Sequence, residues 1–75
     1  MVTPEEVITA MAEAELSTSV SNVQVDLPLV LQGLDSLDMA TLMFALESKY
    51  NRQIPPEKAA RLRTISDIVK FLNAP

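Results

Sequence analysis

The chain has 75 residues, ten acidic and six basic, with a formal net charge of −4, and it contains no Cys, His or Trp. Without Cys there is no disulfide, and without Cys or His the usual zinc ligands are missing. Cys and His, the two side chains most used as nucleophile and general base, are therefore absent. Disorder is excluded by an apolar content of 48%, and the acidic balance argues against binding to nucleic acid.

The length suffices for one domain, close to the lower limit for a fold held by a single core. No run approaches the roughly 18 consecutive apolar residues that a membrane span needs. The first residues carry no positive charge, unlike the start of a secretory signal. We therefore expect a single domain over residues 1–75, located in the cytoplasm.

The charges are divided unevenly along the chain. Residues 1–48 contain eight acidic and no basic residues, a net −8, whereas residues 49–75 contain six basic and two acidic residues, a net +4. The two halves could pack against each other as complementary surfaces. Alternatively, the molecule could present a surface of both signs to partners, where the charge pattern governs encounter and choice.

The sequence Thr3-Pro4-Glu5-Glu6 has the features of a helix start. Thr3 can cap the helix, Pro4 suits the first helical position and Glu6 can complete a capping box. Apolar residues then recur at helical spacing: Val7, Ile8, Met11 and Ala14. We predict a helix over about residues 4–16.

Residues 17–34 begin with turn-forming side chains and continue with aliphatic ones. Val23, Val25 and Leu27 alternate as in a strand, but no second strand is available to pair with them. We therefore predict a long loop whose aliphatic side chains cover the core: Val25, Leu27, Leu29 and Leu31. Loops of this length are usually functional or packed by their own side chains.

A second helix begins near Ser36. Asp35 is a good N-cap, and Asp38 three residues later supports it. The helix is expected to run to about Tyr50, where Asn51-Arg52-Gln53 breaks it.

The rest of the chain predicts two more helices. Ile54-Pro55-Pro56 forces an extended entry into a short helix over about residues 56–62. Thr64 and Asp67 form a capping box for a last helix over about residues 64–73. The residues thus predict an all-α fold, a small bundle of three longer helices and a short third one, with a long loop between the first two.

At 100° per residue, the helix over residues 36–50 has two apolar faces. One is a core stripe of ordinary width: Met39, Leu42, Met43, Leu46 and Tyr50. The opposite face carries Leu37, Ala40 and Phe44, with Thr41 and Ser48 beside them. Either the long loop or the short helix covers this second stripe, or the stripe is an exposed ridge for a partner, rimmed by Asp35, Asp38 and Glu47.

Ser36 is the residue that suggests chemistry. A serine at a helix start is usually a cap, but Asp35 already offers that cap, which leaves the Ser36 hydroxyl free to face solvent. Gly33 lets the backbone approach without a side chain in the way. A helix N-terminus favours a phosphate, so a serine phosphodiester is supported here. Asp35 and Asp38 would partly oppose it, but they could hold a divalent cation during its formation.

The sequence Gly33-Leu34-Asp35-Ser36-Leu37-Asp38 resembles the G-x-D-S-L motif of acyl carrier proteins. Further agreement with the pattern of that family runs without gaps from Ser36 onward, at Leu42, Ala45-Leu46-Glu47, Tyr50, Ile54-Pro55 with Glu57, and Thr64-Ile65 with Asp67-Ile68. The resemblance covers essentially the whole chain in length and helix order and is strongest over residues 33–72.

The resemblance implies a four-helix bundle that carries 4′-phosphopantetheine, with Ser36 as the attachment residue. A phosphopantetheinyl transferase would transfer this group from coenzyme A with Mg²⁺, and the thiol of the arm would carry acyl groups as thioesters between enzymes. The cofactor would thus supply the reactive group that the chain lacks. The protein would be a non-catalytic carrier without a metal of its own.

The resemblance also implies partners: the transferase, an acyl-loading ligase or acyltransferase, and downstream biosynthetic enzymes. We expect a monomer whose partner surface consists of Asp35, Leu37, Asp38, Ala40, Thr41, Phe44, Glu47 and Glu57. Carriers of this family can hide the acyl chain between their helices. The candidates for that pocket are Leu42, Leu46, Ile54, Leu62 and Ile68, each of which could equally be ordinary core.

Some residues depart from the pattern of general fatty-acid carriers. Such carriers have Glu at the positions of Thr41 and Ser48 and an acidic third helix. Here the third helix and its end are basic, with Lys58, Arg61 and Arg63, and Leu31-Gln32 replaces the usual acidic and aliphatic pair before the glycine. These differences favour a dedicated fatty-acid, polyketide or related pathway with its own partners.

Two alternatives remain open. The protein could be an aminoacyl or aryl carrier loaded by an adenylating ligase, although Asp35 before Ser36 is typical of acyl carriers. It could also be an unmodified carrier-like module that acts only through protein interactions.

Overall fold

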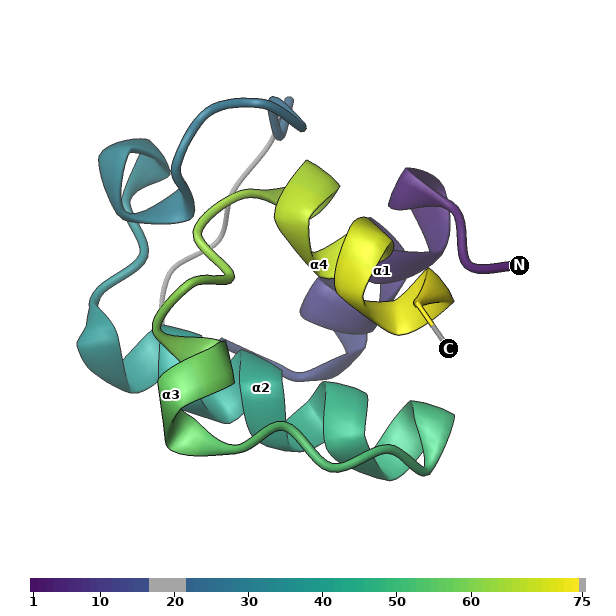
Figure 1. The fold of residues 1–75 in the computed structure, drawn as a ribbon. Helices are drawn as coiled ribbons and strands as arrows, with labels where there is room; N and C mark the ends of the chain where they lie inside the picture. Colours follow the sequence, from purple (N-terminus) through teal and green to yellow (C-terminus); the bar gives the residue numbers. More distant parts are fainter. Residues whose placement is uncertain (17–21, 75) are drawn as a thin grey trace.

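The computed structural model describes residues 1–16 and 22–74. Within these residues the elements follow in the order α1 (Pro4–Glu13), η1 (Leu29–Gln32, a 3₁₀ helix), α2 (Ser36–Tyr50), α3 (Pro56–Ala59) and α4 (Ile65–Asn73). α1 packs against both α2 and α4, and α3 is a single turn between α2 and α4 (Figure 1). The described part contains no strand, so the expected all-α bundle of three longer helices and one short one is confirmed.

The helix starts follow the predicted capping residues. Asp35 with Asp38 and Thr64 with Asp67 form complete capping boxes. Thr3 also caps α1, because its Oγ1 accepts the N–H of Glu6 at 3.2 Å. The box predicted there is not completed: the Glu6 carboxylate accepts the Thr3 hydroxyl at 3.3 Å rather than a backbone N–H.

Two helices end earlier than predicted. α1 ends at Glu13 rather than near residue 16, because Glu15 has a φ of 54°, in the left-handed region where a helix cannot continue. α3 ends at Ala59 rather than near residue 62. The N–H groups of Arg61 and Leu62 bond to carbonyls three residues back, at 2.9 and 3.1 Å, which forms tight turns instead of an α-helix. The predicted bounds of α2 and α4 are confirmed.

The core is a single cluster to which every α-helix or its flanking segment contributes. Its buried members are Val7, Ala10, Met11, Leu29, Leu34, Leu42, Met43, Leu46, Ile54, Leu62, Ile65, Ile68 and Leu72. The predicted core stripe of α2 is therefore confirmed, with Met39 and Tyr50 half-buried at its edges. None of the described helices has the length and apolarity needed to cross a bilayer.

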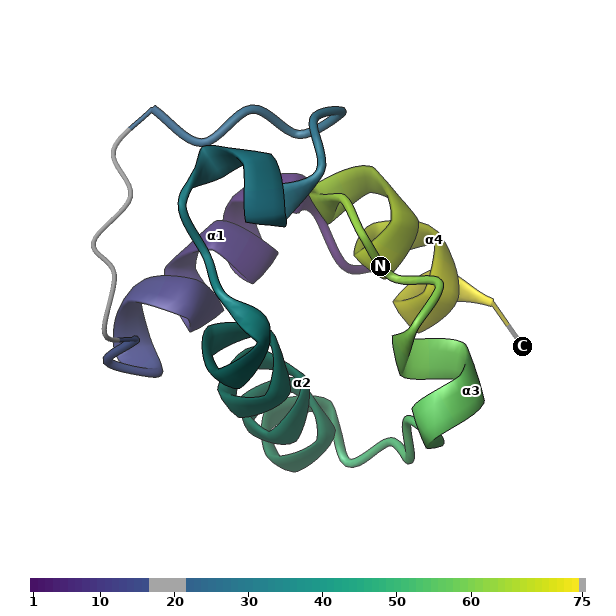
Figure 2. The same ribbon diagram turned by 90° about the vertical axis from the view of Figure 1, so that its left-hand side faces the viewer.

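The long loop is described from residue 22; residues 17–21 lie outside the described residues. It crosses from the side of α1 to α4, and η1 then returns the chain to the start of α2 (Figure 2). Two hydrogen bonds from Ser66, at the start of α4, hold the part of the loop before η1. The N–H of Ser66 donates to Val25 O at 2.9 Å, and its Oγ donates to Asp26 Oδ1 at 2.6 Å. Leu29 is fully buried, with its N–H bonded to Arg63 O at 2.8 Å.

Val25 and Leu27 are half-buried, as expected of residues that cover the core. The prediction for Leu31 is wrong, because this side chain is 69% exposed. Gln32 explains the difference: its Nε2 donates to the carbonyls of Gln24 and Leu27, at 2.9 and 2.8 Å. The loop is thus tied back to η1 by a polar side chain, and its neighbour Leu31 turns outward.

Candidate functional site

Ser36 is the first residue of α2 and is exposed to solvent. The preceding Asp35 caps the helix, because its Oδ1 accepts the N–H of Asp38 at 2.8 Å. The Ser36 hydroxyl is therefore not needed as a cap, and it makes no hydrogen bond within residues 1–16 and 22–74. An exposed hydroxyl thus lies at the N-terminus of a 15-residue helix, where a negative group is favoured.

Gly33 makes the approach to this serine possible. It closes η1 with a φ of 110°, a left-handed conformation that strongly favours glycine. Its N–H and that of Leu34 bond to the carbonyls of Val30 and Leu29, at 3.4 and 3.3 Å. The turn therefore brings η1 to the start of α2.

A groove of about 500 Å³ opens beside Ser36. Its lining comes from η1 and the residue before it, from α2, and from α3 and the residues after it: Pro28, Val30, Leu31, Ser36, Met39, Ala59, Ala60, Leu62 and Arg63. Apart from Ser36 and Arg63, all of these side chains are apolar. Sequence reasoning missed this groove because no single periodic stretch connects the three segments.

The outer face of α2 is an exposed apolar ridge, which we call the α2 ridge and define as Leu37, Ala40 and Phe44. Leu37 and Phe44 are each 70% exposed, and Ala40 and the neighbouring Thr41 are exposed too. Neither the described part of the loop nor α3 covers this face. The interpretation of the second stripe as extra core is therefore wrong, and the ridge faces solvent.

The acidic residues expected at the partner surface differ in their exposure to solvent. Asp35 and Glu57 are exposed. Asp38 is only 2% exposed, and its carboxylate accepts the N–H of Asp35 at 3.4 Å, so it cannot belong to a partner surface. Glu47 is half-buried, and its Oε2 accepts the N–H of Ile54 at 2.8 Å, which holds the segment before α3; its place at the partner surface stays a prediction.

The five residues expected to line an acyl pocket are all buried in the core: Leu42, Leu46, Ile54, Leu62 and Ile68. Only Leu62 also lines the groove beside Ser36. The structure thus brings the five together as packed core, and their part in holding an acyl chain stays a prediction.

The basic side chains fall into two groups. Lys49 donates to Glu13 at 2.9 Å, the single ion pair within the described residues, and this hydrogen bond raises the pKa of Lys49 above its usual 10.5. Arg52 donates to the carbonyls of Leu72 and Ala74 and lies over the ring of Phe71. The four others are exposed and form no ion pair within the described residues: Lys58, Arg61, Arg63 and Lys70.

The acidic and basic halves of the chain are therefore joined by one surface ion pair rather than by a neutralising interface, within residues 1–16 and 22–74. The same residues contain no cluster of three or more side chains of the kinds that bind metals. Asp38 is buried in its capping box, which leaves Asp35 as the exposed carboxylate nearest in sequence to Ser36.

The family model described as the phosphopantetheine attachment site matches residues 6–72, nearly the whole chain. The geometry fits the group that this family attaches: an exposed hydroxyl without a hydrogen bond at a helix N-terminus can accept a phosphodiester, and an apolar groove adjoins it. The chain belongs to the phosphopantetheine attachment family, to which acyl carrier proteins belong, and its prosthetic group is 4′-phosphopantetheine.

Proposed function

We propose that this protein is an acyl carrier protein that holds 4′-phosphopantetheine on Ser36. It shuttles acyl groups between enzymes of a dedicated fatty-acid, polyketide or related biosynthetic pathway in the cytoplasm, and it catalyses none of their reactions. The observation that carries the proposal is the exposed Ser36 hydroxyl at the first position of α2, inside the family match over residues 6–72.

The attachment transfers one phosphopantetheinyl group from coenzyme A. A bond forms between Ser36 Oγ and the phosphorus that bears pantetheine, while the bond from that phosphorus to adenosine 3′,5′-bisphosphate breaks. The hydroxyl proton passes to a base of the transferase. The chain contributes the Ser36 hydroxyl, which is not needed as a cap because Asp35 caps the helix. It also contributes a helix N-terminus that favours the new phosphodiester.

When bound, the arm supplies the thiol that carries acyl groups as thioesters, which accounts for the absence of Cys and His from the chain. Tethering raises the effective concentration of the carried group at each enzyme that the protein meets. The α2 ridge, which begins one residue after Ser36, is suited to those contacts because it is apolar and solvent-exposed. The exposed Asp35, Thr41 and Glu57 complete the proposed partner surface.

Intact-mass spectrometry tests the attachment. After incubation with coenzyme A, Mg²⁺ and a broad-specificity phosphopantetheinyl transferase, the protein should gain the mass of one phosphopantetheinyl unit. Ser36→Ala should gain nothing, whereas Ser48→Ala, an exposed serine on the same helix, should be loaded like the natural chain. Loading of Ser36→Ala would contradict the assignment, and failure of the natural chain to gain mass would favour an unmodified interaction module.

The class of cargo is tested next on the loaded protein. The loaded protein is incubated separately with acyl, aminoacyl and aryl donors, each with a matching ligase or acyltransferase. Intact mass then shows which donor adds a group to the loaded protein. Selective acylation supports the acyl carrier. Selective loading with an amino acid or an aryl acid would instead assign the chain to the other class of thiol-template carriers.

A further inference from the structure

We propose that the groove beside Ser36 holds the phosphopantetheine arm against the protein, with the Arg63 guanidinium bound to the phosphodiester. This inference rests on the attachment at Ser36 proposed above. It adds a binding site and an anion-binding residue for the attached arm, so that the loaded protein has a docked resting state.

The groove has the size and character of a small-molecule site. Its volume of about 500 Å³ lies within the range of such sites, and its lining is apolar with few polar groups. Ser36 is one of its lining residues, so a group attached there starts at the groove. Val30 and Leu31, two of the few large apolar side chains that are exposed, lie along the same groove and would be covered by the arm.

The backbone of Arg63 is held at this groove by two hydrogen bonds, and its side chain is available to bind an anion. Its N–H donates to Asp67 Oδ2 at 3.2 Å, and its carbonyl accepts the N–H of Leu29 at 2.8 Å. These two bonds fix the backbone to α4 on one side and to η1 on the other. The side chain is exposed and forms no ion pair within the described residues, and arginine is the residue best shaped to bind a phosphate with two parallel hydrogen bonds.

The charges around Ser36 favour an ion pair between Arg63 and the phosphodiester. A phosphodiester on Ser36 would stand next to the exposed carboxylate of Asp35. The N-terminus of α2 offsets that repulsion in part, and a cation lining the same groove offsets more of it. Of the exposed cations without a described ion pair, Arg63 lines the groove, whereas Lys58, Arg61 and Lys70 are not part of its lining.

The test compares unloaded and loaded protein for the natural chain, Arg63→Gln and the matched control Arg61→Gln. Loading is verified by intact mass before melting temperatures and phosphorus NMR spectra are recorded. We expect loading to raise the melting temperature of the natural chain and of Arg61→Gln by about 2–5 °C at low salt. Arg63→Gln should lose roughly half or more of that increase and shift the phosphorus resonance, and added salt should reduce the increase in the natural chain.

A carboxylate at the free end of a carried group is the other oxyanion that could reach Arg63. The same transferase is therefore supplied with coenzyme A, butyryl-coenzyme A or succinyl-coenzyme A. An Arg63-dependent increase already present with the bare arm supports the phosphodiester. An increase that appears only with the succinyl group would overturn it in favour of a cargo carboxylate.

Two results separate this inference from the proposed function. If all three proteins gain the expected mass and Ser36→Ala gains none, but Arg63→Gln and Arg61→Gln melt alike in both states, Ser36 is the attachment residue and the docked arm is wrong. If the natural chain gains no mass, the attachment itself is wrong.

Discussion

The two apolar faces of α2 differ in their exposure to solvent. Leu42 and Leu46 are fully buried on the inner face, whereas Leu37 and Phe44 on the outer face are each 70% exposed. Because a small domain gains from burying every large apolar side chain it can, an exposed ridge beside the proposed attachment residue supports the proposal that this surface binds another molecule. The hydrophobicity of a residue therefore does not reveal its role here; the face on which it lies does.

The largest effect expected is from truncation on the inner face. Leu46→Ala should lower the free energy of unfolding by about 2–5 kcal/mol, because it leaves a cavity in a fully packed core. That is a large part of the roughly 5 kcal/mol or more that a small domain has in total. Urea denaturation followed by circular dichroism measures the loss. The control is Phe44→Ala on the outer face, which should change stability by about 0.5 kcal/mol or less. Equal losses of stability in the two variants would show that the outer face is core as well.

The same Phe44→Ala variant should instead weaken contacts with partner enzymes. Loss of an exposed aromatic anchor typically costs about 1–3 kcal/mol of binding, roughly a 5- to 150-fold loss in kcat/KM for transfer to Ser36 when the carrier concentration is varied. Ser48→Ala, exposed on the same helix and outside the α2 ridge, serves as the control and should retain the natural value. Unchanged kinetics in Phe44→Ala would show that the transferase does not use the ridge.

The helices could be predicted from the sequence because their signals are local. Capping residues such as Asp35 and Thr64 act within one turn, and the core stripe of α2 repeats within one segment. The groove could not be predicted, because Leu31, Ser36 and Arg63 come from three segments and meet only in the folded chain. The exposure of Leu31 depends on hydrogen bonds from the neighbouring Gln32, which a hydrophobic pattern does not reveal.

The hydrogen bonds of the acidic side chains on α2 could not be predicted from the sequence. The sequence places Asp38 at the rim of the α2 ridge, and therefore at the partner surface, but its carboxylate turns back to the N–H of Asp35 and is buried. Glu47, which the sequence places at the same rim, accepts the N–H of Ile54, seven residues further along the chain. In both cases a backbone N–H without another partner attracts the carboxylate, and sequence spacing alone does not show which N–H groups lack a partner.

The N-terminal end of α2 provides the next prediction, since both faces begin there. Asp35→Ala should destabilise the unloaded protein by about 0.5–2 kcal/mol, because the N–H of Asp38 loses its acceptor. Asp35→Asn should restore most of the loss, since an amide oxygen can also cap a helix. Thermal melting of the three proteins measures this. An Asp35→Asn variant as unstable as Asp35→Ala would show that the charge of Asp35, rather than its capping bond, is what matters.

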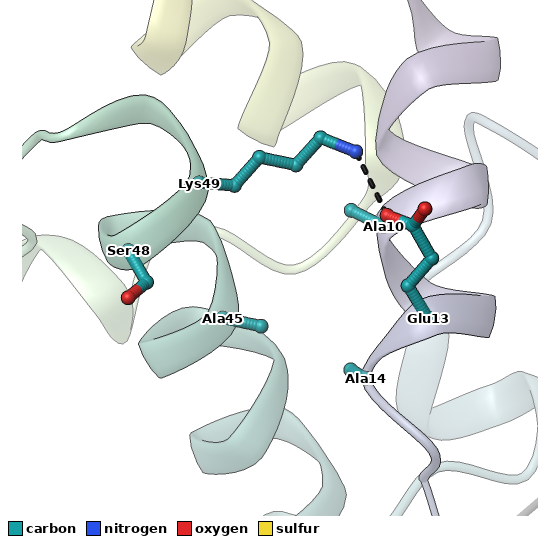
Figure 3. Close-up of a pocket in the computed structure, with 6 residues that line it drawn as sticks. All are labelled: Ala10, Glu13, Ala14, Ala45, Ser48 and Lys49. Atoms are coloured by element: carbon teal, nitrogen blue, oxygen red, sulfur yellow. Dashed lines mark hydrogen bonds and ion pairs between the residues drawn. The ribbon is translucent and has the colours of Figure 1, made fainter.

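The C-terminal end of α2 should show the smallest effect. Here Lys49 donates to Glu13 across a hollow of about 440 Å³ between α1 and α2, otherwise lined by small side chains: Ala10, Ala14, Ala45 and Ser48 (Figure 3). The contrast with the groove at Ser36 is informative. The cation of this hollow is already paired within the chain, whereas Arg63 has no ion pair within the described residues. We therefore expect Lys49→Gln to affect stability slightly and loading of Ser36 not at all.

The pH dependence of that slight effect follows from the raised pKa of Lys49. The hydrogen bond with Glu13 favours the protonated amine in the folded state, so the pKa of Lys49 rises above 10.5, its value in an unfolded chain. The stabilisation is then fully present below about pH 10 and is lost as the pH rises through the higher pKa of the folded state. The difference between the urea midpoints of the natural chain and Lys49→Gln should therefore be constant from about pH 7 to about pH 9 and shrink above that. Because both side chains are exposed, added salt should shrink it as well. A difference that stays constant in alkali and at high salt would mean that Lys49 stabilises the bundle through the packing of its aliphatic chain and not through Glu13.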